Sequence, residues 1–137
     1  MGLVHAEIIL KNAGDVTNVR RGVINESEIR QTTVQAMVDT GAVTLVINEA
    51  VRQQLGLEIE EEYEAELADG SKKACVLTES VQILWKNRKT SCHAVVVPTA
   101  NEILLGAIPL EAMDLIINPQ KQELIGAHGD EVVLMLK

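Results

Sequence analysis

Aromatic residues are scarce in this sequence. It contains one Trp, one Tyr and no Phe among 137 residues, although 47% of its residues are hydrophobic. The core must therefore be built from Val, Ile, Leu and Ala, and β-branched residues favour strands. The length suits one domain with a sizeable core, so we expect a single mainly β domain over residues 1–137.

Cysteine and histidine are also scarce. Cys75 and Cys92 form no CxxC motif, which excludes a disulfide framework and a cysteine-based metal site. His5, His93 and His128 lie far apart without the spacing of zinc ligands. We therefore expect neither a metal nor a cofactor.

Positive charge is in deficit, since the formal net charge is −8. Nonspecific binding to nucleic acid or to an anionic membrane surface is therefore not expected. No charged-then-apolar leader is seen, and no apolar run is long enough to span a membrane. Together with the few cysteines, this favours a cytoplasmic protein with reduced thiols.

Short apolar runs separated by turn residues predict a curled or closed β-sheet. The expected strands cover residues 3–10, 32–38, 43–47, 57–67, 71–85, 91–97, 102–106, 115–117, 123–125 and 132–136. Capping residues predict one helical turn at residues 26–30 and short helices at about 49–55 and 109–113. The polar stretch 11–21 is expected to be a loop.

Residues 57–71 predict a hairpin, because apolar and acidic residues alternate along its first strand. A three-residue loop with Gly70 in the left-handed region best matches the faces of the two strands. This register predicts four opposed pairs: Leu67 with Ser71, Glu66 with Lys72, Tyr63 with Cys75, and Leu57 with Val81. The apolar residues of both strands would then share a half-buried face. The acidic face is more simply a solvated surface than a site for basic substrates.

Asp39 is the residue for which the sequence most clearly suggests chemistry. The apolar strand Ala36–Val38 leads into it, and Thr40 and Gly41 then turn the chain. A carboxylate at the end of a buried strand is costly unless it is paired or used. Two carboxylates that share one proton can hydrolyse an amide, but the chain contains only one Asp-Thr-Gly. A catalytic pair would therefore need a second chain across a two-fold axis.

Cys92 and His93 are a weaker candidate for a nucleophile and its base. Neighbouring residues of a strand point to opposite faces, so these two side chains are not expected to form a catalytic pair.

The segment Ala36–Ala42 closely resembles the active-site motif of the retropepsin-like aspartic proteases. Residues 66–71 resemble the tip of the flap hairpin in that family. Residues 103–106, followed by a short helix, resemble its hydrophobic-hydrophobic-Gly segment. The resemblance runs from about residue 3 to residue 125 and looks closest to the small stand-alone bacterial and archaeal members.

The resemblance implies an acid-protease fold: a curled or closed β-barrel with one flap hairpin and one or two short helices. Asp39 would be the catalytic carboxylate of each protomer, Thr40 would hydrogen-bond across the dimer axis, and Gly41 would let the substrate backbone approach. Substrate contacts would come from Ala42 and from the hairpin tip, Ala68, Asp69, Gly70 and Ser71. Leu105 and Gly106 would pack against the active-site loop. The chain ends would contribute to the homodimer interface, and the substrate would be a peptide bound as an extended strand.

Two departures from the retroviral pattern occur together. Val43 and Ala107 stand where those proteases usually have an acidic residue and an Arg that form an ion pair. Losing both partners leaves no buried charge unpaired. We expect an aspartic endopeptidase. A non-catalytic dimerisation or peptide-binding module with the same fold is the main alternative, and an unrelated β-barrel binder with a chance motif is another.

Overall fold

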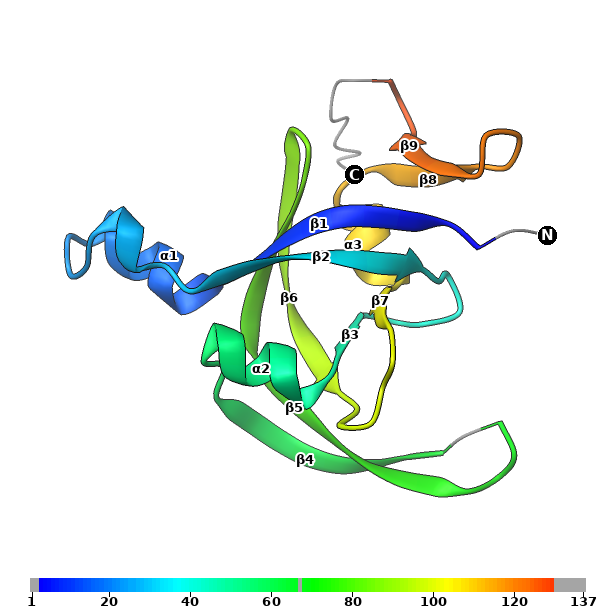
Figure 1. The fold of residues 1–137 in the computed structure, drawn as a ribbon, viewed down its shortest axis with the longest axis horizontal. Helices are drawn as coiled ribbons and strands as arrows, with labels where there is room; N and C mark the ends of the chain where they lie inside the picture. The colour runs from blue at the N-terminus through cyan, green and yellow to red at the C-terminus, as the bar shows by residue number, and fades with distance from the viewer. Residues whose placement is uncertain (1–2, 67, 130–137) are drawn as a thin grey trace, which may run out of the picture.

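The computed structural model describes residues 3–66 and 68–129 and has a closed β-barrel at its centre (Figure 1). The ring runs through β1 (His5–Asn12), β2 (Gln31–Val38), β7 (Ile103–Leu105), β3 (Leu45–Ile47), β6 (Arg88–Val96) and β5 (Lys72–Trp85). It closes because β1 pairs with both β2 and β5. The sheet ends at β4 (Ile59–Glu66), which pairs with β5 outside the ring. The expected mainly β fold with a closed sheet is confirmed.

The barrel interior is filled by aliphatic side chains, as the scarcity of aromatic residues predicts. Ile8, Leu10, Leu45, Ile83 and Leu105 are fully buried. Side chains alternate across each strand, so every second residue of β1 faces this core. Full burial of one such side chain contributes about 1.5–3 kcal/mol to stability.

The stretch expected to be a loop at residues 11–21 forms a helix, α1 (Ala13–Arg20), so that prediction is wrong. Asn12 caps it: its Oδ1 accepts a hydrogen bond from the Asp15 N–H at 3.1 Å, and its Nδ2 donates to the Leu55 carbonyl at 2.9 Å. Asp15 in turn accepts two hydrogen bonds of 2.9 Å from the Arg30 guanidinium. The helix is therefore stabilised by polar contacts rather than by an apolar face.

The other helices agree with the predictions. A 3₁₀ turn, η1 (Glu26–Glu28), and two short helices, α2 (Glu49–Leu55) and α3 (Ala107–Ala112), lie where they were expected. The Asn48 side chain accepts a hydrogen bond from the Val51 N–H at 3.0 Å, and Gly56 ends α2 with φ at +61°. No helix in the described part of the chain is long and apolar enough to cross a membrane.

The β4–β5 hairpin has the predicted register near its tip and a different one near its base. Glu66 pairs with Lys72 and Tyr63 with Cys75, and Gly70 has φ at +84°. A bulge between Ile59 and Glu61 shifts the pairing, so that the Glu79 N–H donates to the Glu58 carbonyl at 2.9 Å. The predicted pairing of Leu57 with Val81 is therefore wrong. Leu67, expected opposite Ser71, lies outside the described residues.

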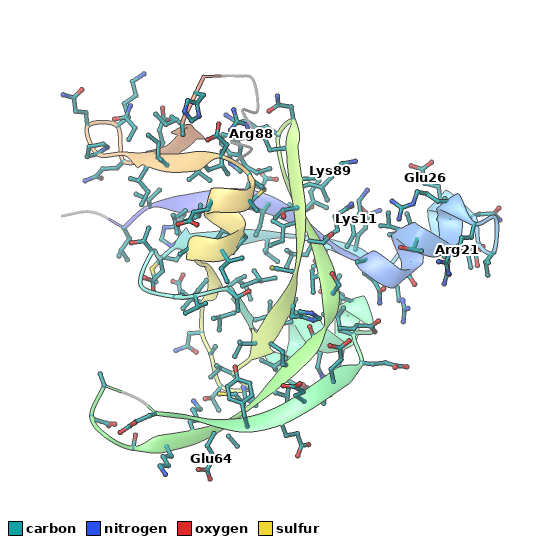
Figure 2. All side chains as sticks on the ribbon, turned by 180° about the vertical axis from the view of Figure 1, so that it is seen from behind. Lys11, Arg21, Glu26, Glu64, Arg88 and Lys89 are labelled. Atoms are coloured by element: carbon teal, nitrogen blue, oxygen red, sulfur yellow. The ribbon has the colours of Figure 1, made fainter. Side chains whose placement is uncertain are left out.

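The hairpin projects beyond the barrel, and the expected half-buried apolar face forms only in part, with Leu57 and Cys75 buried. Ile59 is 45% exposed and Tyr63 is 41% exposed. Figure 2 shows the Glu64 side chain pointing away from the barrel. All five alternating glutamates are exposed, which agrees with a solvated acidic face: Glu58, Glu60, Glu62, Glu64 and Glu66.

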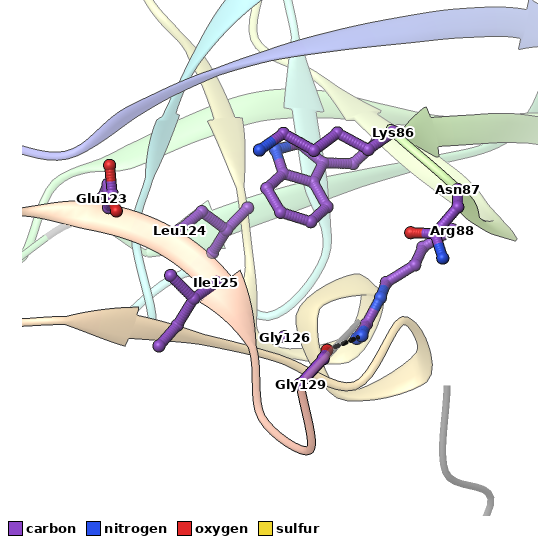
Figure 3. Close-up of a pocket in the computed structure, with 9 residues that line it drawn as sticks. Lys86, Asn87, Arg88, Glu123, Leu124, Ile125, Gly126 and Gly129 are labelled. Atoms are coloured by element: carbon purple, nitrogen blue, oxygen red, sulfur yellow. Dashed lines mark hydrogen bonds between the residues drawn. The ribbon is translucent and has the colours of Figure 1, made fainter. Parts of the chain in front are cut away.

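A separate two-stranded sheet follows α3. It consists of β8 (Leu115–Asn118) and β9 (Glu123–Gly126). Arg88, which is 2% exposed, joins it to the barrel: its Nη1 donates to the carbonyls of Met113 at 2.9 Å and Asp114 at 2.6 Å. Its Nη2 donates to the Gly129 carbonyl (Figure 3). The strand expected at residues 132–136 lies outside the described residues.

Candidate active site

Asp39 lies at the end of β2, and β7 fixes its backbone. The strands β2 and β7 run parallel, with Val38 opposite Leu105. The Asp39 N–H extends this pairing by donating to the Leu105 carbonyl at 3.0 Å. Leu105 is fully buried, so the Asp39 main chain is anchored directly to the barrel core.

The turn after Asp39 is closed by its own carboxylate. Asp39 Oδ1 accepts a hydrogen bond from the Gly41 N–H at 2.9 Å, and the Ala42 N–H donates to the Asp39 carbonyl at 3.1 Å. Thr40 and Gly41 are exposed, and Asp39 itself is half-buried. The expectation of a buried carboxylate is therefore wrong for the single chain, because this edge of the barrel is open.

Gly106 lies against the same loop. The Ala107 N–H donates to the Ala42 carbonyl at 2.8 Å, and the Ile108 N–H donates to the Val43 carbonyl at 2.9 Å. A Cβ at residue 106 would lie 2.6 Å from the Ala42 carbonyl oxygen and would also meet the Thr44 carbonyl oxygen. Glycine is therefore required by a close backbone approach, and the loop is held between β7 and α3.

Apolar side chains are exposed beside this loop. Val43 is 68% exposed, and Ile108 and Ile116 are each 50% exposed. A cavity of about 340 Å³ adjoins them, lined by Thr40, Ala107, Leu110, Glu111, Leu115, Ile116 and Ile117. We call Val43, Ile108, Ile116 and this lining the apolar face. Val43 and Ala107 stand where retroviral proteases usually have an ion pair; Val43 is exposed, and Ala107 lines the cavity.

The hairpin residues predicted to bind substrate lie at the tip of β4–β5. Ala68, Asp69, Gly70 and Ser71 are all exposed. The Ser71 hydroxyl and its N–H, the latter at 2.9 Å, both donate to Asp69 Oδ1 and lower the pKa of the Asp69 carboxyl. In Figure 1 the hairpin tip and the β2–β3 connection lie on the same side of the barrel. The hairpin tip therefore lies on the side of the barrel that carries Asp39, although it belongs to a different element.

A family model described as "gag-polyprotein putative aspartyl protease" matches residues 25–112, which include the Asp39 turn, the hairpin and Gly106. The chain belongs to this aspartyl protease family. The mainly β barrel is the fold that the retropepsin-like resemblance implies.

Solved structures give a more distant likeness. The chain is similar to a retropepsin-like aspartic protease from Rickettsia conorii, with 21% identity over 86% of this chain and 89% of that chain and a TM-score of 0.45. A search of curated proteins finds no match.

The structure gives little support for a cysteine nucleophile or a metal site in this member of the aspartyl protease family. Partial burial raises the pKa of the Cys92 thiol, which disfavours the thiolate that a cysteine nucleophile needs. The His93 ring lies 2.8 Å from the Thr78 carbonyl and 3.3 Å from the Glu60 carboxylate. Among the described residues, no group of three or more His, Cys, Asp or Glu side chains could hold a metal ion.

Sequence reasoning missed a cavity of about 410 Å³ beside the middle of the β4–β5 hairpin. It is lined on the hairpin side by residues that include Tyr63, Cys75 and Val76, and on the barrel side by Val96 and Pro98. Its two sides come from segments 20 or more residues apart in sequence, so no local pattern predicts it. The cavity shown in Figure 3, about 290 Å³ around Trp85 and β9, lies elsewhere, beside the β5–β6 turn.

Proposed function

We propose that this chain is an aspartic endopeptidase that acts as a homodimer, with Asp39 of each copy forming one catalytic dyad. The observation that carries the proposal is the Asp39 turn itself. Its carboxylate closes the turn, its backbone is fixed by Leu105, and Gly106 holds the loop from behind. Membership of the aspartyl protease family supports the same chemistry.

Two copies of Asp39 would share one proton. Like charges held about 3 Å apart cannot both ionise, so one carboxyl stays protonated while the other is charged. The charged carboxylate takes a proton from water as the water oxygen attacks the peptide carbonyl carbon. The protonated carboxyl donates to the carbonyl oxygen, and a proton then passes to the leaving nitrogen as the C–N bond breaks. The products are a new carboxyl terminus and a new amine.

The apolar face supports the homodimer. Ile116 lines the 340 Å³ cavity together with Thr40, and Val43 and Ile108, which a backbone hydrogen bond joins, are also exposed. An exposed apolar region rimmed by polar residues is typical of an interaction surface. A second copy that covers it would bring its own Asp39 turn to the two-fold axis, with Thr40 hydrogen-bonding across it. Val43 and Ala107 would then replace the retroviral ion pair by apolar packing.

The substrate would be a peptide in extended conformation. The hairpin tip, Ala68 to Ser71, would close over it, and Gly41 would let its backbone approach the dyad closely. Ala42 would add a contact beside the turn. We further propose a cytoplasmic location, which accords with two cysteines that form no disulfide, Cys75 and Cys92.

Cleavage of a mixed peptide library, from acid to neutral pH with mass-spectrometric readout, tests the proposal. Asp39→Asn is expected to abolish cleavage while sedimentation still shows the dimer, and Glu26→Gln, at an exposed carboxylate on η1, is the matched control. Equal cleavage by Asp39→Asn and the unmodified protein would refute the dyad. A dimer that binds peptides without cleaving them would favour the non-catalytic module.

A further inference from the structure

The outer half of the β4–β5 hairpin leaves the barrel at a defined point. Toward the hairpin tip, the last pair that joins β5 to β6 is Val76 with Val96. From Lys72 to Cys75, the β5 ladder continues only with β4. The position of this outer half relative to the barrel therefore depends on side-chain contacts rather than on the β5–β6 ladder.

One such contact is a hydrogen bond between Lys73 and Thr99. The Lys73 ammonium donates to the Thr99 hydroxyl at 2.6 Å. The two residues are separated by 26 positions, with Lys73 three residues beyond Gly70 of the tip. The bond thus connects the hairpin tip region to the segment between β6 and β7.

Thr99 is held on a rigid support. The Ala100 N–H donates to the Val97 carbonyl at 2.9 Å, which closes a turn with Pro98 and Thr99 at its centre. Proline at this position fixes the backbone of such a turn. The Val97 N–H donates to the Ile47 carbonyl at 2.9 Å, so the turn is also tied to β3. A few residues later the same segment becomes β7, whose Leu105 anchors Asp39.

The space behind this bond is not packed. The 410 Å³ cavity lies between the hairpin and the segment that carries Val96 and Pro98. This space is a groove open to solvent, so the close packing of a protein core is lacking along it. Cys75 is buried, but the residues between it and the tip can change their distance from the barrel without disrupting a packed core.

We propose that Lys73 and Thr99 are positioning residues whose hydrogen bond holds the hairpin closed over bound peptide. The inference deepens the proposed endopeptidase function and rests on it. Closure by this bond does not touch the reacting atoms, so it acts on peptide binding rather than on the hydrolytic step. Its loss should raise KM and leave kcat almost unchanged.

Two nearly isosteric variants test the bond from both sides. Lys73→Met and Thr99→Val each should raise KM for a cleaved library peptide about fivefold, the effect of one hydrogen bond, with kcat within about twofold. The double variant should be no worse than either single variant, because both remove the same interaction. Thr99→Ser keeps the hydroxyl and should retain the original KM.

Lys72→Met is the matched control. Lys72 is the preceding residue on β5, its side chain is 67% exposed, and its ammonium lies 3.9 Å from the Glu64 carboxylate. This variant loses the same charge without touching Thr99, so its KM should not change. An equal rise of KM in Lys72→Met would overturn the proposal in favour of a general charge effect. Additive losses in the double variant would also overturn it.

Hydrogen exchange of the hairpin amides separates this proposal from the proposed function. Lys73→Met and Thr99→Val should speed exchange in residues 72–77 about fivefold, and Lys72→Met should not. Unchanged exchange in the first two variants would overturn the positioning role, whatever the activity. Faster exchange in a protein that cleaves no peptide would support the contact and refute the endopeptidase function alone.

Discussion

Gly106 lies so close to Ala42 that a Cβ added to residue 106 would stand 2.6 Å from the Ala42 carbonyl oxygen. The backbone of Gly106 is extended, with φ at −91° and ψ at −173°, which any residue can adopt. The requirement for glycine therefore comes from proximity and not from a left-handed conformation. The main chain of the Asp39 turn is thus in direct contact with the main chain at the start of α3.

Replacing Gly106 by Ala should disrupt the Asp39 turn. The added methyl group would collide with the carbonyls of Ala42 and Thr44, so the loop must move, and we expect a loss of about 3 kcal/mol or more in unfolding free energy. Urea denaturation and peptide cleavage are the measurements. Gly22→Ala is the control: φ there is +73° with open space around it, so about 1 kcal/mol is expected. Equal losses in both variants would contradict the close-approach argument.

Replacing Ile108 by Lys should weaken the homodimer. Ile108 is 50% exposed in the single chain and belongs to the apolar face, so a charge there would be buried against the second copy. We expect the dimer dissociation constant to rise at least about tenfold, and hydrolysis to fall with the dimer fraction. Sedimentation velocity over a concentration series gives the constant.

Val23→Lys is the matched control for this prediction. Val23 is 67% exposed and belongs to the connection after α1. Figure 1 shows α1 on the opposite side of the barrel from the β2–β3 connection. A dimer that tolerates Ile108→Lys as well as Val23→Lys would show that the apolar face is not the interface.

Local signals account for the elements that the sequence predicts correctly. Asn48 and Gly56 delimit α2 because each forms its contact within a few residues. The Gly70 turn sets the tip register for the same reason. The helix α1 was missed although Asn12 and Asp15 stand at capping positions. Its stability also depends on Arg30 and Leu55, which no window around residue 12 contains.

Long-range contacts account for the remaining differences. The bulge that displaces Leu57 from Val81 is accompanied by a hydrogen bond from the Glu58 N–H to the Glu79 carboxylate at 2.7 Å. Face matching along two strands cannot anticipate such a bond. The half-burial of Asp39 also differs from the sequence argument, which placed this carboxylate at the end of a buried strand. The motif identifies the carboxylate, and in the proposed homodimer the second copy would cover it.

Asp15 should make stability depend on pH at the acid end. The Arg30 guanidinium donates two hydrogen bonds to Asp15 and lowers the pKa of that carboxyl, while burial opposes this effect. The folded-state pKa lies below the unfolded value of about 3.9, so the stabilisation is fully present above that pH. It is lost as the pH falls through the folded-state pKa.

Asp15→Asn should therefore narrow the difference in unfolding free energy between pH 7 and pH 3. Urea titrations at both pH values give this difference, and Glu26→Gln serves as an exposed carboxylate control. If Asp15→Asn and Glu26→Gln changed the pH dependence of the unfolding free energy equally, the pairing of Asp15 with Arg30 would not be its cause.

Arg88 should be essential for attaching the β8–β9 sheet to the barrel. Its guanidinium donates to three carbonyls, those of Met113, Asp114 and Gly129, and it lies 3.8 Å from the Asp114 carboxylate. Arg88→Met would leave these three carbonyls, of which that of Met113 is buried, without their donor, at a cost of about 3–5 kcal/mol. Arg88→Lys keeps the charge but not the planar guanidinium, so an intermediate loss of unfolding free energy is expected.

Lys89→Met is the control. The neighbouring Lys89 is exposed, so this variant should change the free energy of unfolding by less than about 0.5 kcal/mol in urea denaturation. An Arg88→Met protein as stable as Lys89→Met would show that the β8–β9 sheet is held by its apolar contacts alone.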